Sequence, residues 1–203
     1  MTNLRLYSKA FYIPLLFLFF IVVFVAGRIA FMVFNHQLFA PYTLPDYLQS
    51  IGHGLKHDAS VAGYFTALPG FLLLASCWTK TNAIKWISRA YFLVLTFFIA
   101  AVFSVDSILY EYWGFRLDST PLFYLLSPKE ALASTSFFTN LTGILTTFGI
   151  SALIYVFVRK FLVPKSLIAA NCKHRILLSS VVFLQIALLF LPIRGGVKES
   201  TMN

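Results

Sequence analysis

The sequence predicts an all-α membrane protein with five transmembrane helices, its N-terminus inside the cell and its C-terminus outside. Composition, the spacing of apolar stretches and the distribution of charge support this prediction. Of the 203 residues, 59% are hydrophobic and only 11% are charged, which lies outside the range of soluble domains. Backbone groups in lipid must hydrogen-bond within their own segment, so we expect helices rather than strands.

The predicted transmembrane helices follow five long apolar stretches, because about 20 apolar residues are needed to cross a bilayer. The first stretch follows Arg5 and Lys9, as in a secretory signal, but it is too long and no small-residue cleavage site precedes Arg28. It is therefore predicted to be an anchor. No internal repeat or linker divides the chain, so we expect one domain. The predicted helices cover residues 10–34, 59–78, 86–108, 128–158 and 176–193.

The charged residues sort onto two sides of the predicted membrane. The N-terminal tail and the second and fourth gaps between helices hold ten basic residues and no acidic residue. The remaining segments hold six basic and all seven acidic residues. Lysine and arginine favour cytoplasmic segments, so the N-terminus is predicted inside and the C-terminus outside. The net charge of +9 then follows from topology, and we expect no nucleic-acid partner.

Both outer connections are predicted to carry a short interfacial helix. Pro45-Asp46 favours a helix that ends near Gly54, and Thr120-Pro121 favours another that runs to Leu126. Ser127-Pro128-Lys129-Glu130 combines an N-cap serine, a first-turn proline and a glutamate three residues after the cap. This motif predicts that the fourth transmembrane helix begins at Pro128.

Three charged residues are expected at one level, just inside the outer boundary of the membrane. Arg28 lies about 27 Å beyond Ala10 on the first helix and Asp106 about 24 Å beyond Ala90 on the third, while Asp58 begins the second. Charged groups in membrane segments are costly and tend to pair. Our hypothesis is that Arg28 pairs with Asp58 or Asp106. The alternative is that each side chain extends separately to water.

Two further groups of polar residues lie in the outer connections. His53 and His57 have a spacing that could bind zinc on one helix face. However, we expect Gly54 to interrupt that helix, and no third ligand is evident, so histidines in an interfacial loop are the favoured interpretation. Glu111, Arg116 and Asp118 flank an aromatic stretch and could form a lipid-headgroup cradle or a docking face. A solvated loop with interfacial aromatic residues explains them as well.

The chain offers candidates for binding but no catalytic set. Its sequence contains no phosphate-binding glycine loop, no Cys/His metal set and no Ser/His/Asp constellation that the spacing supports. No catalytic residue, metal ligand or cofactor site is therefore predicted in this chain. The candidates for contacts with anionic lipid headgroups or with another domain are Arg28, Lys56, Asp58, Asp106, Glu111, Arg116, Asp118 and Lys129.

Several outer-side stretches resemble the membrane domain of the bacterial lipoteichoic acid synthase-like, or phosphoglycerol transferase, family of the sulfatase superfamily. They occur along nearly the whole chain, in the order and at the topological positions that the family uses. The matching stretches are Gly27-Arg28, Gly54-Leu55-Lys56-His57-Asp58-Ala59-Ser60, Tyr110-Glu111-Tyr112-Trp113-Gly114-Phe115-Arg116-Leu117-Asp118, Ser127-Pro128-Lys129-Glu130-Ala131 and Pro192-Ile193-Arg194-Gly195-Gly196-Val197.

This resemblance implies an anchor in the bacterial cytoplasmic membrane, followed by an extracytoplasmic sulfatase-like domain. That domain would carry a nucleophilic threonine and a divalent metal, manganese or zinc, and would act on membrane lipid headgroups. The sequence stops at Asn203, where the segment leading to that domain is expected, so none of its catalytic residues can be assigned here. The alternative is a complete, small, non-enzymatic membrane protein, such as a transporter subunit or assembly factor.

The predicted orientation can be tested with an epitope tag. We expect a tag after Asn203 to be accessible from outside intact cells, because lysine and arginine keep the N-terminal tail and the second and fourth gaps in the cytoplasm. A tag at the N-terminus should become accessible only after the membrane is permeabilised. A C-terminal tag that is reached only from the cytosol would contradict the topology.

Overall fold

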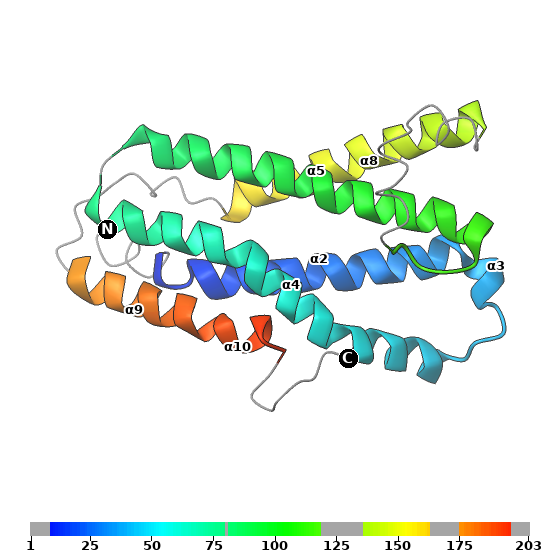
Figure 1. Cartoon of the computed structure of the whole chain (residues 1–203), viewed down its shortest axis with the longest axis horizontal. Helices are drawn as coiled ribbons and strands as arrows, with labels where there is room; N and C mark the ends of the chain where they lie inside the picture. The colour runs from blue at the N-terminus through cyan, green and yellow to red at the C-terminus, as the bar shows by residue number, and fades with distance from the viewer. Residues whose placement is uncertain (1–8, 80, 119–135, 163–174, 196–203) are drawn as a thin grey trace. The chain divides into compact units, whose positions relative to one another are not determined.

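The computed structural model describes residues 9–79, 81–118, 136–162 and 175–195 (Figure 1). These residues are largely helical, and no strand occurs among them. They include five helices that are long and apolar enough to cross a membrane. The predicted all-α class with five membrane-spanning helices is confirmed.

The helices follow one another along the chain with short connections where the structure describes them. Among the described residues the π-helical segment η1 continues directly from α8. The helices are α2 (Tyr12–Phe34), α3 (His36–Phe39), α4 (Leu44–Trp78), α5 (Asn82–Trp113), α8 (Phe137–Phe157), η1 (Val158–Leu162), α9 (Arg175–Leu188) and α10 (Phe190–Ile193).

Helix α4 differs most from the sequence prediction. It begins where a short interfacial helix was expected, and the Thr43 backbone N–H and hydroxyl both donate to the Asp46 carboxylate, at 2.8 and 2.6 Å. The helix then continues through Gly54 to Trp78 instead of ending. A glycine inside a helix costs only about 1 kcal/mol, which packing can offset. Asp58 therefore lies inside α4 and does not begin it.

Two other predicted boundaries differ or remain untested. Helix α5 continues to Trp113, so Glu111 is helical although the predicted helix ended at residue 108. The motif Ser127-Pro128-Lys129-Glu130 and the second predicted interfacial helix lie outside the described residues. The described part of the fourth transmembrane helix begins at Phe137, where the Ser136 side chain accepts a hydrogen bond from the Thr139 N–H.

The chain divides into two compact units, and each is described by itself. The first unit comprises Met1–Arg28, Tyr42–Ala90 and Arg159–Asn203, and the second comprises Ile29–Pro41 and Tyr91–Val158. Helices α2 and α5 each run from one unit into the other. The boundary between the units therefore falls within these helices and not at their ends.

In the first unit, α9 and α10 pack along α4 (Figure 1). Small residues on α4 allow this contact. A Cβ atom on Gly63 would lie 2.8 Å from Cγ1 of Ile193, and one on Gly70 would lie 3.0 Å from Cγ1 of Ile186. Small residues at such positions let membrane helices approach closely. The Ser60 hydroxyl also donates to the Ile193 carbonyl at 3.2 Å, which ties α10 to α4.

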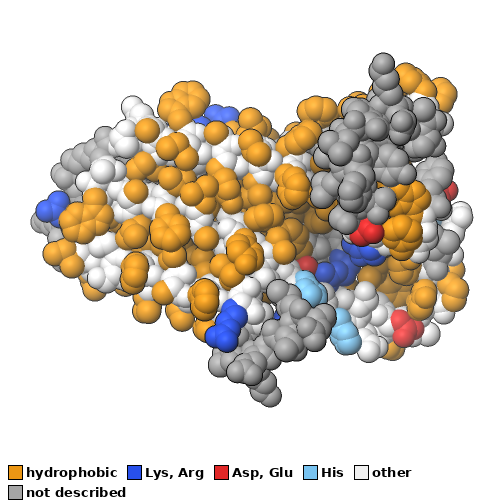
Figure 2. All heavy atoms as spheres, viewed as in Figure 1, with side chains coloured by type: hydrophobic (Ala, Val, Ile, Leu, Met, Phe, Trp, Pro, Cys, Tyr) orange, Lys and Arg blue, Asp and Glu red, His pale blue; other side chains and the backbone are white. Residues whose placement is uncertain are grey.

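Hydrophobic side chains are spread widely over the surface visible in Figure 2. Exposed examples occur on every long helix, including Val22, Phe71, Phe98, Phe148 and Phe183. A soluble monomer rarely exposes apolar patches of this extent. This surface therefore fits contact with lipid, and it agrees with a multi-pass membrane protein.

Candidate functional site

The first polar centre is an ion pair between α2 and α4 inside the first unit. Nη2 of Arg28 lies 2.7 Å from Oδ1 of Asp58, and Nη1 donates to the Ile51 carbonyl at 3.0 Å. The two charged side chains are only 15% and 9% exposed. The predicted pairing of Arg28 with Asp58 is confirmed, and the alternative of separate extension to water is wrong for these two residues.

Gly54 makes room for this pair. A Cβ atom built on Gly54 would overlap the Arg28 guanidinium, so only glycine fits beneath it without a shift. Ile51, Gly54 and Asp58 are spaced three and four residues apart, which places them on one face of α4. The Ile51 carbonyl, the Gly54 backbone and the Asp58 carboxylate therefore form the binding site of the Arg28 guanidinium. The expected helix break at Gly54 was wrong, because the glycine serves close packing.

The other polar residues of this stretch are exposed. His53, Lys56 and His57 project from α4 into the surroundings. Since α4 is continuous, His53 and His57 lie one turn apart on it, contrary to the expected interruption. Among the described residues, no group of three or more His, Cys, Asp and Glu side chains could hold a metal ion.

The second polar centre lies in the second unit, around Asp106 on α5. Its carboxylate is 6% exposed and accepts hydrogen bonds from Nε of Arg116 at 2.8 Å and from the Leu117 N–H at 2.8 Å. Nη2 of Arg116 also lies 2.6 Å from the carboxylate. Asp106, which was predicted as an alternative partner of Arg28, therefore pairs with Arg116.

The chain must turn back after α5 to make this contact. Gly114 has φ +71°, a conformation that glycine adopts without a Cβ clash, and its N–H donates to the Tyr110 carbonyl at 2.9 Å. This turn ends the helix and returns Arg116 and Leu117 to Asp106. The loop is thus tied to the helix that precedes it.

An aromatic ring also contacts the Arg116 guanidinium. The guanidinium carbon lies 4.2 Å from the centre of the Phe31 ring, which is buried and makes an edge-to-face contact with Tyr110 at 4.9 Å. A guanidinium is attracted to the face of such a ring and stacks well on it. Arg116 is therefore held by a carboxylate and a ring while its side chain remains 55% exposed.

The remaining candidate residues are not brought into either centre by the contacts described. Glu111 is exposed on α5, and Asp118 is exposed in the segment that follows Arg116. Lys129 lies outside the described residues. Phe31 was missed by sequence analysis, because a phenylalanine within an apolar helix carries no signal that an arginine stacks on it.

Comparisons with models of protein families, with curated proteins and with solved structures found no match to this chain. The two polar centres and the surface around them are therefore the features that bear on function.

Replacing Gly54 tests the binding site of the Arg28 guanidinium on α4. Gly54→Ala should displace the guanidinium and lower the free energy of unfolding by about 1–3 kcal/mol, the cost of leaving a buried polar group without its partner. Gly52→Ala is the matched control, since a Cβ there would meet no atom within 4 Å. It should be neutral or stabilising by up to about 1 kcal/mol through helix propensity. Thermal unfolding in detergent measures the stability of both variants. Equal stability would contradict the packing of the Arg28 guanidinium against Gly54.

Proposed function

We propose that this chain is a membrane anchor that binds anionic lipid headgroups at the outer face of the bacterial cytoplasmic membrane. It would present them to a phosphoglycerol transferase-like or sulfatase-like enzyme domain. The observation that carries the proposal is Arg116, a cation that is locked in place by Asp106 and Phe31 and is nevertheless more than half exposed.

A held arginine suits a lipid phosphate. The planar guanidinium forms charge-assisted, paired hydrogen bonds with phosphate oxygens. Asp106 engages Nε and Nη2, while 55% of the Arg116 side chain stays accessible. Because the rotamer is already fixed, binding would cost less conformational entropy than it does for a mobile side chain.

The two units offer different kinds of cation. In the first unit Arg28 is paired and mostly buried, so we assign it to positioning α2 against α4 and not to headgroup contact. Lys56 is exposed on α4 and is the candidate headgroup contact of that unit. Lys129 keeps the same proposed role from its sequence position.

Aromatic residues beside Arg116 support a position at the membrane surface. Trp113 and Phe115 stack with ring centres 5.6 Å apart at the end of α5. Tryptophan is enriched where a helix leaves the hydrocarbon core. Exposed Glu111 and Asp118, nearby in the sequence, are the candidate residues for docking the enzyme domain.

An anchor of this kind would raise the rate of a lipid-modifying enzyme through proximity. A tethered active site searches a surface, and its effective concentration toward membrane lipids is high. The divalent metal, manganese or zinc, would belong to the enzyme domain. A complete non-enzymatic membrane protein remains the alternative, and coding DNA that continues in frame past codon 203 into a sulfatase-type domain would distinguish the two.

Headgroup binding can be followed with Trp113 as the single tryptophan, after Trp78→Phe and Trp86→Phe. In nanodiscs, phosphatidylglycerol that is spin-labelled near its headgroup should quench Trp113 more than equally labelled phosphatidylcholine. Arg116→Gln should reduce that preference about fivefold, the effect of one basic residue at an anionic surface. Arg116→Lys should keep part of it, because it retains charge but loses the planar fork.

Lys85→Gln on the predicted cytoplasmic side is the control and should leave the preference unchanged. If Arg116→Gln lowers quenching by both lipids equally, Arg116 is only structural and the proposed headgroup contact is wrong.

A further inference from the structure

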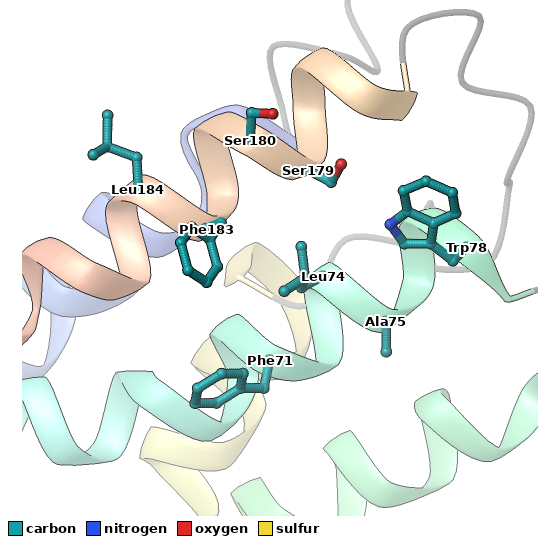
Figure 3. Close-up of a pocket in the computed structure, with 8 residues that line it drawn as sticks. All are labelled: Phe71, Leu74, Ala75, Trp78, Ser179, Ser180, Phe183 and Leu184. Carbon is teal, nitrogen blue, oxygen red and sulfur yellow. The ribbon is translucent and has the colours of Figure 1, made fainter.

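A groove lies between the C-terminal part of α4 and α9 within the first unit (Figure 3). Its volume is about 710 Å³, within the range of small-molecule sites. Leu74 and Phe183 point from the two helices into the space between them (Figure 3). The lining residues are Phe71, Leu74, Ala75, Trp78, Ser179, Ser180, Phe183 and Leu184.

The walls of the groove are apolar and open to the outside of the unit. Phe71, Phe183 and Leu184 are 53%, 62% and 60% exposed, respectively. On helices that cross a membrane, such a groove faces lipid chains and not water. Its long walls therefore suit a hydrocarbon chain.

One end of the groove is polar and basic. Trp78, which lines the groove, lies beneath Arg175, whose guanidinium carbon is 5.5 Å from the ring centre. Ser179 lies one turn after Arg175, and its hydroxyl donates to the Ile176 carbonyl at 3.0 Å. Here α4 ends and α9 begins, so this end is at the membrane boundary that the charge distribution predicts to be cytoplasmic.

The sequence offers no nearby acidic residue for Arg175. No aspartate or glutamate occurs between Asp58 and Asp106, or between Glu130 and Glu199. The helix ends at this boundary therefore carry positive charge without a carboxylate in their own connecting segments. The phosphates of membrane lipids lie at this level and are suitable anions for Arg175.

We propose that this groove binds one acyl chain of an anionic phospholipid in the cytoplasmic leaflet, with the lipid phosphate at Arg175 and Trp78. The lipid chain contacts Phe71, Leu74 and Phe183, and the headgroup lies where Arg175 stacks on the indole. A second copy of the chain is a less suitable occupant, because stable protein interfaces bury about 1,200–2,000 Å² and this groove is the size of a single small ligand.

This site is independent of the proposed headgroup contact at Arg116. It uses other residues and the opposite predicted leaflet, and it would serve the stability of the α4–α9 contact whatever the protein's activity. Either proposal can fail without the other.

The test uses Trp78 as the single tryptophan, after Trp86→Phe and Trp113→Phe, with the full chain in phosphatidylcholine vesicles. Phosphatidylglycerol with brominated acyl chains, added as a minor component, should quench Trp78 more than brominated phosphatidylcholine at the same mole fraction. Arg175→Gln should reduce this preference about fivefold, as expected for the loss of one basic side chain at an anionic surface. Arg175→Lys should retain most of it.

Two matched controls separate the site from general effects. Lys160→Gln removes an exposed basic residue on η1, and it should leave the preference intact. Ser179→Phe should fill the groove and lower quenching, whereas Leu177→Phe, at an exposed position of α9 outside the groove, should not.

Equal quenching by the two lipids would overturn the proposal. So would a preference that survives Arg175→Gln, or one that falls equally with Lys160→Gln, because surface charge alone would then explain the result.

Discussion

A buried charge inside a membrane segment constrains this structure more than any other feature. The Arg28 guanidinium lies on a helix that has lipid and other helices around it, where an unpaired charge is costly. The α4 face formed by the Ile51 carbonyl, Gly54 and Asp58 supplies both a counter-ion and a hydrogen-bond acceptor. Removing one partner of a buried pair costs about 3–5 kcal/mol, and the 15% exposure of Arg28 places this pair toward the lower end. The pair therefore sets how α2 and α4 meet.

In the second unit, the need to pair a buried charge leads to a different arrangement. Asp106 is as buried as Asp58, but its partner comes from a loop and not from another helix. The pair holds the segment after α5 close to that helix and leaves Arg116 largely exposed. One ion pair thus positions two helices, while the other positions a cation at the surface. This difference is why we assign Arg28 to architecture and Arg116 to binding.

Much of the architecture could be predicted from hydropathy, because a bilayer requires long apolar helices. The Arg28–Asp58 pair could also be predicted, because each charge falls near one end of an apolar stretch. The continuation of α4 through Gly54 could not be predicted. Glycine weakens an isolated helix, and its role in close packing becomes apparent only once the neighbouring residue is known. The contact between Asp106 and Arg116 depends on the turn at Gly114, and the stacking on Phe31 depends on tertiary packing. Neither leaves a pattern in the local sequence.

The most direct test of the central pair is a double-mutant cycle on Arg28 and Asp58. The free energy of unfolding in detergent would be measured for Arg28→Met, Asp58→Asn and the double variant. We expect each single variant to be strongly destabilised and the double variant to lose much less than their sum, with a coupling energy of about 2 kcal/mol or more. Additivity within about 0.5 kcal/mol would show that the two residues do not interact, and it would contradict the role given to the pair.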